Sequence, residues 1–301
     1  MKILVTGSSG FVGSAVVSFL KIAGHEVVKL VRTRANLLPD EVAWDLERGV
    51  ISPEALEGIE GVVHLAGENI WDRRWNEAKK KRILDSRAKG TRLLCEALAS
   101  LKNPPKVLVS ASATGYYGSR GDEKLTEQSM AGSGFLAYVC KEWEAATKPA
   151  SDKGIRVVNL RIGIVLSPKG GALGKMLPPF NWGLGGQLGS GQQYMSWIVI
   201  DDLLTIIGTA LQQESIKGPL NAVSPNPVTN QEFTHELGHV LHRPTFMRLP
   251  AFALRAIFGE AADEMLLASC RVYPRVLLSS GFLFAYPTLD GALSYLLCGK
   301  N

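Results

Sequence analysis

Three glycines near the start of the chain have the neighbours and the spacing of a phosphate-binding turn. Gly7, Gly10 and Gly13 follow an apolar run that begins at residue 2 and precede an amphipathic stretch at 12–23. At such a strand-to-helix turn, backbone N–H groups and the helix dipole favour a pyrophosphate, and glycines allow a tight turn and a close backbone approach. The alternative is a strand–turn–helix corner that binds no ligand. The candidate cofactor-binding residues of this segment are Gly7, Ser9, Gly10, Phe11, Val12 and Gly13.

The end of the second expected strand, near 26–31, indicates which dinucleotide binds. A site for NAD places Asp or Glu there to hydrogen-bond the ribose 2′-hydroxyl, and that acid would repel a 2′-phosphate. Here Arg32 and Arg34 follow the strand, and their guanidinium groups offer positive charge and a planar set of donors. The sequence therefore predicts NADP as the cofactor. The alternative is a pair of solvated arginines on a loop.

Two further strand ends are expected to line the cofactor. Asp45 follows the third strand, where its carboxylate either accepts a hydrogen bond from the adenine amino group or caps a turn. Leu65, Ala66 and Gly67 follow the fourth strand, where small residues let the backbone run close to the cofactor. His64, directly before them, is expected to be a packed core histidine rather than a catalyst.

The alternation of strand-like and helix-like segments predicts an α/β fold with a Rossmann-like, doubly wound parallel sheet. Strands are expected near 2–6, 26–31, 41–44, 61–65, 106–111 and 155–161, and helices near 11–23, 73–100 and 134–150. Further helices are expected near 200–213, 229–241, 250–268 and 288–298. We expect an NADP-binding domain over 1–165, with a return segment near 195–225, and a smaller substrate and lid lobe over 166–301.

Residues 167–195 are rich in glycine and proline. A loop of that length in a compact domain is usually a functional lid, a binding loop or a disordered segment. Trp182, Tyr194 and Trp197 are expected to be buried, which favours an ordered lid over the substrate.

The glycine spacing, the strand end at 64–67 and the serine-bearing strand at 107–112 together resemble the extended short-chain dehydrogenase/reductase superfamily. Further stretches resemble its epimerase-like subgroup, which is related to human SDR39U1 and the bacterial YfcH type, over nearly the whole chain. These stretches are Leu65-Ala66-Gly67-Glu68-Asn69-Ile70, Ser112-Ala113-Thr114-Gly115-Tyr116-Tyr117-Gly118, Lys141-Glu142-Trp143-Glu144, Ser196-Trp197-Ile198, and the C-terminal segment 271–287. The resemblance implies chemistry on a small, nucleotide-linked carbonyl or alcohol substrate.

In this superfamily Tyr is the acid or base toward the substrate, Lys lowers the Tyr pKa and holds the nicotinamide ribose, and Ser positions the substrate oxygen. The resemblance implies that Ser112, Tyr138 and Lys141 are the catalytic candidates, with Lys141 also binding cofactor. Tyr and Lys normally lie four residues apart, but the residue four before Lys141 is Ala137. Tyr138 is three before it, a slip that rotates the phenol by about 100° around a helix.

Other residues are open alternatives in the same pocket. Thr114 could take the role of the serine, and Tyr116 or Tyr117 could supply the phenol, although both tyrosines could equally be packing aromatics. Arg161 and Asp201 are expected to help frame the pocket, and Asp201 could instead cap the helix that follows it.

Composition excludes several classes of protein. The 301 residues are 46% hydrophobic and 20% charged, which is typical of an ordinary folded protein, and no apolar run is long enough to cross a membrane. The four scattered cysteines favour a reduced, cytoplasmic protein without disulfides. The net charge of +5 comes largely from residues 73–89, which we interpret as a solvated helix face, since no nucleic-acid-binding motif accompanies it. The resemblance leaves a homodimer open.

One motif is set aside. His235-Glu236-Leu237-Gly238-His239 matches the His-Glu-x-x-His pattern of zinc proteases. Five-residue patterns recur by chance, and this one lies in the C-terminal lobe of an expected dinucleotide-binding chain. We therefore expect no metal there.

Two functions follow from the sequence. The first is an NADP(H)-dependent oxidoreductase or epimerase-like enzyme that uses Ser112, Lys141 and either Tyr138 or Tyr116. The second is a non-catalytic NADP(H)-binding sensor that reports the state of its cofactor to a partner protein. Ala137 in the tyrosine position favours the sensor, whereas Ser112 and Lys141 favour the enzyme.

Overall fold

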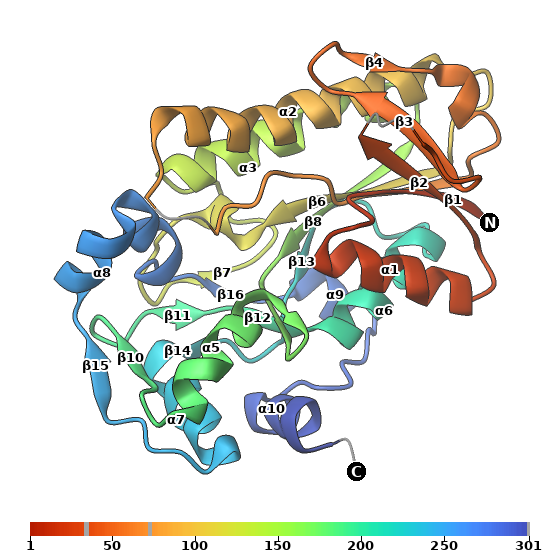
Figure 1. The fold of residues 1–301 in the computed structure, drawn as a ribbon. Coiled ribbons are helices and arrows are strands. Elements are labelled where there is room, and N and C mark those ends of the chain that lie inside the picture. The colour runs from red at the N-terminus through yellow and green to blue at the C-terminus, as the bar shows by residue number, and fades with distance from the viewer. Residues whose placement is uncertain (33–35, 72–73, 300–301) are drawn as a thin grey trace.

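A mainly parallel sheet of eight strands forms the centre of the chain in the computed structural model, which describes residues 1–32, 36–71 and 74–299 (Figure 1). The strand order is β13-β8-β6-β5-β1-β2-β3-β4, and every neighbouring pair is parallel except β3 with β4. The strands are β1 (Lys2–Thr6), β2 (Glu26–Arg32), β3 (Glu41–Asp45), β4 (Val50–Ile51), β5 (Gly61–His64), β6 (Val107–Ala113), β8 (Arg156–Ile162) and β13 (Gly218–Ala222). This order confirms the expected Rossmann-like, doubly wound sheet.

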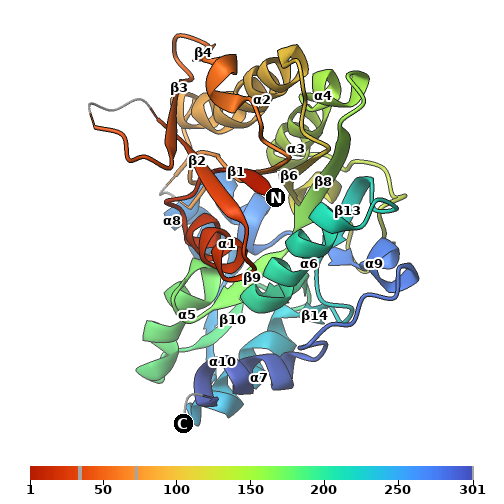
Figure 2. The same cartoon turned by 90° about the vertical axis from the view of Figure 1, so that its right-hand side faces the viewer.

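Helices cover both faces of this sheet, because successive strand side chains point to opposite faces and both sets are apolar. Ile3 and Val5 pack against α1 (Phe11–Ile22) and α6 (Ile200–Gln212), whereas Leu4 packs on the other face against α2 (Glu77–Ser100). Helices α3 (Phe135–Ala145) and α4 (Lys148–Asp152) also contact α2. Figure 2 shows α2, α3 and α4 on one side of the sheet and α1 and α6 on the other.

The second half of the chain builds a smaller lobe that begins where β8 ends. Its core contains Phe180, Trp197, Phe233, Leu237 and Leu293. Its elements are β9 (Ile164–Ser167), α5 (Gly171–Asn181), β10 (Gly186–Leu188), β11 (Tyr194–Met195), β12 (Trp197–Val199), β14 (Val228–Thr229), α7 (Asn230–Leu241), β15 (Met247–Leu249), α8 (Ala251–Phe258), a π-helical turn (Ala262–Leu266), β16 (Arg271–Val272) and α10 (Leu289–Cys298). Helix α9 (Arg275–Ser279) instead contacts β13 and packs in the core of the central sheet. β16 pairs with β7 (Lys124–Leu125), so the two halves of the chain interlock.

Three expectations from the sequence need correction. The glycine-rich stretch at 167–195 is not one long loop, because it contains α5 and β10. Trp197 is fully buried as expected, but Trp182 is 77% exposed, because it follows the last turn of α5 rather than lining its packed side. The helix expected near 134–150 is two helices, since Pro149 lacks an N–H and begins a new helix more easily than it continues one.

The long α2 helix begins at Glu77 rather than near residue 73. The Asn76 side chain accepts a hydrogen bond from the Lys79 N–H at 2.8 Å and thereby caps the first turn. Within the described ranges, no helix combines the length and apolar character that crossing a membrane requires.

The C-terminal segment is tied to α6 by a buried carboxylate. Asp202 accepts hydrogen bonds from the backbone N–H groups of Ala285 and Tyr286 at 2.9 and 3.1 Å. Burial raises the pKa of the Asp202 carboxyl above its usual range. This residue therefore anchors the segment that leads to α10.

Candidate functional site

Two glycines of the turn between β1 and α1, Gly7 and Gly13, have no room for a Cβ. A Cβ on Gly13 would lie 2.0 Å from the Gly7 carbonyl oxygen, and a Cβ on Gly7 would lie 2.8 Å from the Leu65 carbonyl carbon. Gly7 also has a φ of +67°, which side chains with a Cβ rarely adopt. The start of α1 is therefore held directly against the carboxyl ends of β1 and β5.

The N-terminus of α1 can accept an anion. Gly10 is its N-cap, no side chain caps the helix, and the first turn carries no acidic residue. Ser9 and Gly10, directly before the first turn, are exposed, so solvent reaches the start of the helix. This turn fits the pyrophosphate of a dinucleotide, because the bulk of a Cβ is excluded and the helix dipole favours negative charge.

A hairpin of the smaller lobe reaches this turn. A Cβ on Gly170 would lie 2.9 Å from the Phe11 ring, and one on Gly171 would lie 3.2 Å from it. The segment after β9 therefore rests on the first residue of α1.

The residues predicted to select the cofactor lie at the ends of β2 and β3. Arg32 is the exposed last residue of β2 and makes no ion pair within the described part of the chain, whereas Arg34 lies outside the described residues. Asp45 caps the turn after β3, because its Oδ1 accepts the backbone N–H groups of Glu47 and Arg48, both at 3.0 Å. Of the two roles left open for Asp45, the structure shows the turn cap.

His64 is a core histidine, as expected. Its Nδ1 lies 2.7 Å from the Thr6 hydroxyl and its Nε2 lies 2.8 Å from the Thr91 hydroxyl. Burial lowers the pKa of His64 to about 4, so the imidazole is neutral near pH 7. The Thr6 oxygen also accepts the N–H groups of Leu65 and Ala66 at 3.1 Å, which fixes the path of the chain past the cofactor turn.

The hydroxyl of Ser112 is engaged in a buried ion-paired network. Ser112 lies beside Arg161 in the register of β6 and β8 and donates to Glu144 Oε1 of α3 at 2.7 Å. Both oxygens of Glu144 accept from the Arg161 guanidinium at 2.8 Å. Arg161 is 3% exposed, so this bidentate pair is almost completely shielded from water.

Two tyrosines extend this network, Tyr117 through its hydroxyl group and Tyr116 through its ring. Arg161 Nη1 donates to the Tyr117 hydroxyl at 2.9 Å, and that hydroxyl donates to Asn221 Oδ1 at 2.7 Å. The Tyr116 ring lies 3.5 Å from the guanidinium carbon, a cation–π contact. Burial raises the pKa of Tyr117 to about 12. Tyr117 is thus a structural hydrogen-bond donor.

Helix α3 presents Tyr138 and Lys141 on its exposed side. Ala137 and Cys140 face the interior, whereas Tyr138 is 51% exposed and Lys141 is also exposed. Residues three apart on a helix are neighbours, so the phenol and the ammonium group share one face. No hydrogen bond joins Ser112 to either residue within the described chain, and Lys141 forms no ion pair there.

Sequence reasoning overlooked two residues at this site. Glu144 lay inside a quoted motif without a role, and Arg87 was counted in the solvated basic face. Arg87 instead packs inward: it donates to the Glu68 carbonyl oxygen at 3.0 Å, and its guanidinium lies 3.2 Å from the position of a Cβ on Gly67. Its four-residue spacing from the buried Ile83 is the signal that could have revealed this.

A concavity of about 1010 Å³ lies at the edge of the sheet opposite to the glycine turn. It is lined by residues at the amino ends of strands, among them Glu60, Lys106, Arg156 and Gly218. Ligands of open parallel sheets bind at the carboxyl ends, so we assign the cofactor to the glycine turn and not to this concavity.

The doubly wound sheet and its glycine turn define a dinucleotide-binding protein. The model of the NAD dependent epimerase/dehydratase family matches residues 3–222, and a domain of unknown function, DUF1731, matches residues 249–296. The chain belongs to the NAD dependent epimerase/dehydratase family, within the extended short-chain dehydrogenase/reductase superfamily.

Two relatives match over almost their whole length. The epimerase family protein MT2273 of Mycobacterium tuberculosis is 45% identical over 293 residues, which are 97% of this chain and 96% of the relative. Human epimerase family protein SDR39U1 is 38% identical over 296 residues, which are 97% and 98% of the two chains.

Two solved structures are also similar. Human SDR39U1 (isoform 2), crystallised with NADPH, has a TM-score of 0.89 and 38% identity and covers 98% of this chain and 99% of its own. A nucleoside-diphosphate sugar epimerase from Corynebacterium glutamicum has a TM-score of 0.81 and 38% identity and covers 99% of this chain and 58% of its own.

We predict that Glu144→Gln lowers the free energy of unfolding by about 3 kcal/mol, because it leaves the buried Arg161 without its charged partner. Urea denaturation followed by circular dichroism measures this change. Asp152→Asn is the control, since it removes an ion pair of similar length, Lys148–Asp152, whose side chains are 71% and 61% exposed. The control should change stability by no more than about 0.5 kcal/mol. Equal effects of the two substitutions would contradict a structural role of the buried pair.

Proposed function

We propose that this chain binds NADP(H) in the crevice at the carboxyl ends of β1, β5 and β6. The observation that carries the proposal is the turn between Gly7 and Gly13. It has no side-chain cap and no room for a Cβ at either of these glycines, and it offers backbone donors to a pyrophosphate. Human SDR39U1, crystallised with NADPH and similar over the whole chain, supports the same cofactor.

Arg32 would distinguish NADP(H) from NAD(H). It ends β2 and is exposed, and no carboxylate within the described chain pairs with it. A guanidinium group can bind a 2′-phosphate with two parallel hydrogen bonds, whereas the ribose 2′-hydroxyl of NAD(H) gains little from a positive charge.

We further propose that the protein is an NADP(H)-dependent oxidoreductase or epimerase-like enzyme for a small, nucleotide-linked carbonyl or alcohol substrate. When bound, the cofactor accepts or supplies a hydride. Lys141, exposed and without an ion pair in the described chain, would hold the nicotinamide ribose. Tyr138, on the same face of α3, would exchange a proton with the substrate oxygen. The similarity to a nucleoside-diphosphate sugar epimerase supports this substrate class.

A non-catalytic NADP(H)-binding sensor is the second candidate, and two observations favour it. Ala137, at the position of the superfamily tyrosine, is buried and has no acidic group. Ser112, the expected substrate-positioning serine, already donates a hydrogen bond to Glu144. A site built in this way could bind the cofactor without transforming a substrate.

We predict that Arg32→Ala weakens NADPH binding at least tenfold and leaves NADH binding unchanged, because it removes only the partner of the 2′-phosphate. Quenching of intrinsic fluorescence in a cofactor titration measures both affinities. Arg92→Ala is the matched control, since Arg92 is a 56% exposed arginine on α2 whose partner, Glu96, is not a candidate cofactor residue. The assignment fails if wild-type protein binds NADH as tightly as NADPH.

Label transfer separates the enzyme from the sensor. The protein is incubated either with NADPH deuterated at C4 and the keto forms of nucleoside-diphosphate sugars, or with NADP⁺ and the sugars themselves, and products are read by mass spectrometry. The enzyme should transfer deuterium or epimerise a sugar, and Tyr138→Phe should reduce this at least a hundredfold without changing NADPH affinity. Tyr295→Phe, an exposed tyrosine of α10, serves as the control. Tight NADPH binding with no turnover of any substrate would favour the sensor.

A further inference from the structure

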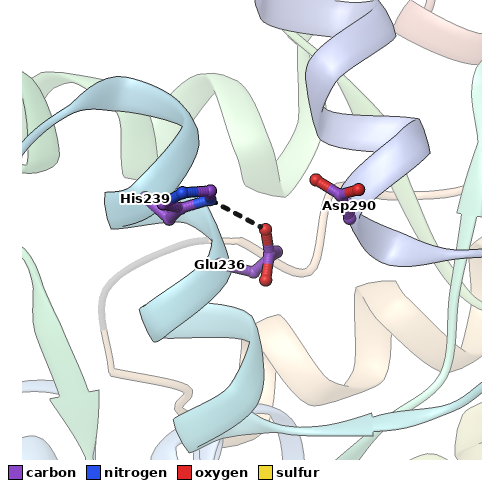
Figure 3. A group of neighbouring side chains, drawn as sticks. All are labelled: Glu236, His239 and Asp290. Carbon is purple, nitrogen blue, oxygen red and sulfur yellow. Dashed lines mark ion pairs between the residues drawn. The ribbon is translucent and has the colours of Figure 1, made fainter.

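Three potential metal ligands meet between two helices of the smaller lobe, far from the glycine turn in the chain. Glu236 and His239 lie one turn apart on α7, and Asp290 lies in the first turn of α10 (Figure 3). One ligand atom of each residue lies within 4.8 Å of the other two. His239 Nδ1 is 3.4 Å from Glu236 Oε1, and the Asp290 carboxylate points toward both side chains.

We propose that Glu236, His239 and Asp290 form a zinc-type site that clamps α10 to α7. An imidazole nitrogen with two carboxylate oxygens is a donor set for zinc and similar transition metals, whereas magnesium and calcium prefer oxygen donors alone. Bonds of about 2.0–2.1 Å in a tetrahedron separate ligand atoms by about 3.3 Å, close to the His239–Glu236 spacing. Small rotations of the Asp290 side chain would complete the set, with water as the fourth ligand.

The charges at this cluster favour a cation. Two carboxylates lie side by side, and within the described chain no lysine or arginine pairs with either of them. A divalent ion would remove the repulsion between the carboxylates. The His239 side chain is 70% exposed and that of Glu236 is 26% exposed, so an ion can enter from solvent.

This ligand set differs from the zinc-protease motif that covers the same helix. The motif uses both histidines as ligands and leaves the glutamate free as a general base. Here the three ligand atoms that converge come from Glu236, His239 and the distant Asp290, and His235 is not one of them. The site would therefore serve to hold two helices together, because its ligands come from both helices and no free glutamate remains beside the metal to act as a general base.

The clamp would act on a helix that already packs against α7. Leu289, Ala292 and Leu293 of α10 are buried in the same cluster as Phe233 and Leu237 of α7. Figure 2 shows the two helices side by side at the end of the molecule that is remote from α2. A metal at the first turn of α10 would fix how the C-terminal helix enters this cluster.

Isothermal titration calorimetry with zinc chloride tests the site. The protein is used without an affinity tag and with Cys298→Ser, since the exposed Cys298 thiol at the far end of α10 could itself bind zinc. We expect one zinc ion per chain, and binding at least tenfold weaker in both His239→Ala and Asp290→Asn. His235→Ala is the matched control and should bind as the parent does. Absence of saturable binding, or an equal loss in His235→Ala, would overturn the proposal.

Hydrogen–deuterium exchange of the same proteins distinguishes a clamp from casual binding at the surface. Zinc should slow amide exchange at least severalfold in α10 of the parent protein and leave it unchanged in Asp290→Asn. The two substituted ligands, His239 and Asp290, and the control residue His235 are all exposed, so the variants should fold, which circular dichroism verifies. Zinc binding that leaves α10 exchange unchanged in the parent would mean an adventitious ion only.

Discussion

The closeness of Gly13 to the Gly7 carbonyl oxygen is the constraint on which the rest of the site depends. A Cβ there would sit 2.0 Å from that oxygen, so helix α1 can approach the end of β1 only because the residue is glycine. Gly7 in turn lies against Leu65 and Ala66, which follow β5. The approach of α1 also sets Phe11 against the glycine hairpin of the smaller lobe. The absence of a side chain at Gly13 thus lets the start of α1, the end of β1 and the segment after β9 pack together.

A buried ion pair holds together the elements around Ser112. Glu144 and Arg161 join α3 to β8. The Ser112 hydroxyl donates to Glu144, and the Tyr117 hydroxyl accepts from Arg161. Buried charges are stable only when every donor and acceptor is satisfied, and here the network satisfies them. The consequence for function is direct. The Ser112 hydroxyl donates to Glu144 in this network, and Tyr138 with Lys141 carries the proposed proton transfer.

Periodicity along the chain was enough to predict the parallel sheet and most of its helices. Local signals also placed the glycine turn and Arg32, because strand, turn and helix there are adjacent in sequence. What could not be predicted depends on contacts between distant segments. Ser112 and Glu144 are 32 residues apart, and Glu264 caps α3 through the Phe135 N–H, 129 residues away. Nothing in a local pattern tells which of several polar partners a buried group will meet.

The most direct test of this account is a crystal structure of the protein with NADPH. The account predicts the pyrophosphate within hydrogen-bond distance of the backbone N–H groups that follow Gly10, and the 2′-phosphate beside the Arg32 guanidinium. The Lys141 ammonium group should lie at the nicotinamide ribose. NADPH bound away from the glycine turn, or with its 2′-phosphate remote from Arg32, would contradict the account.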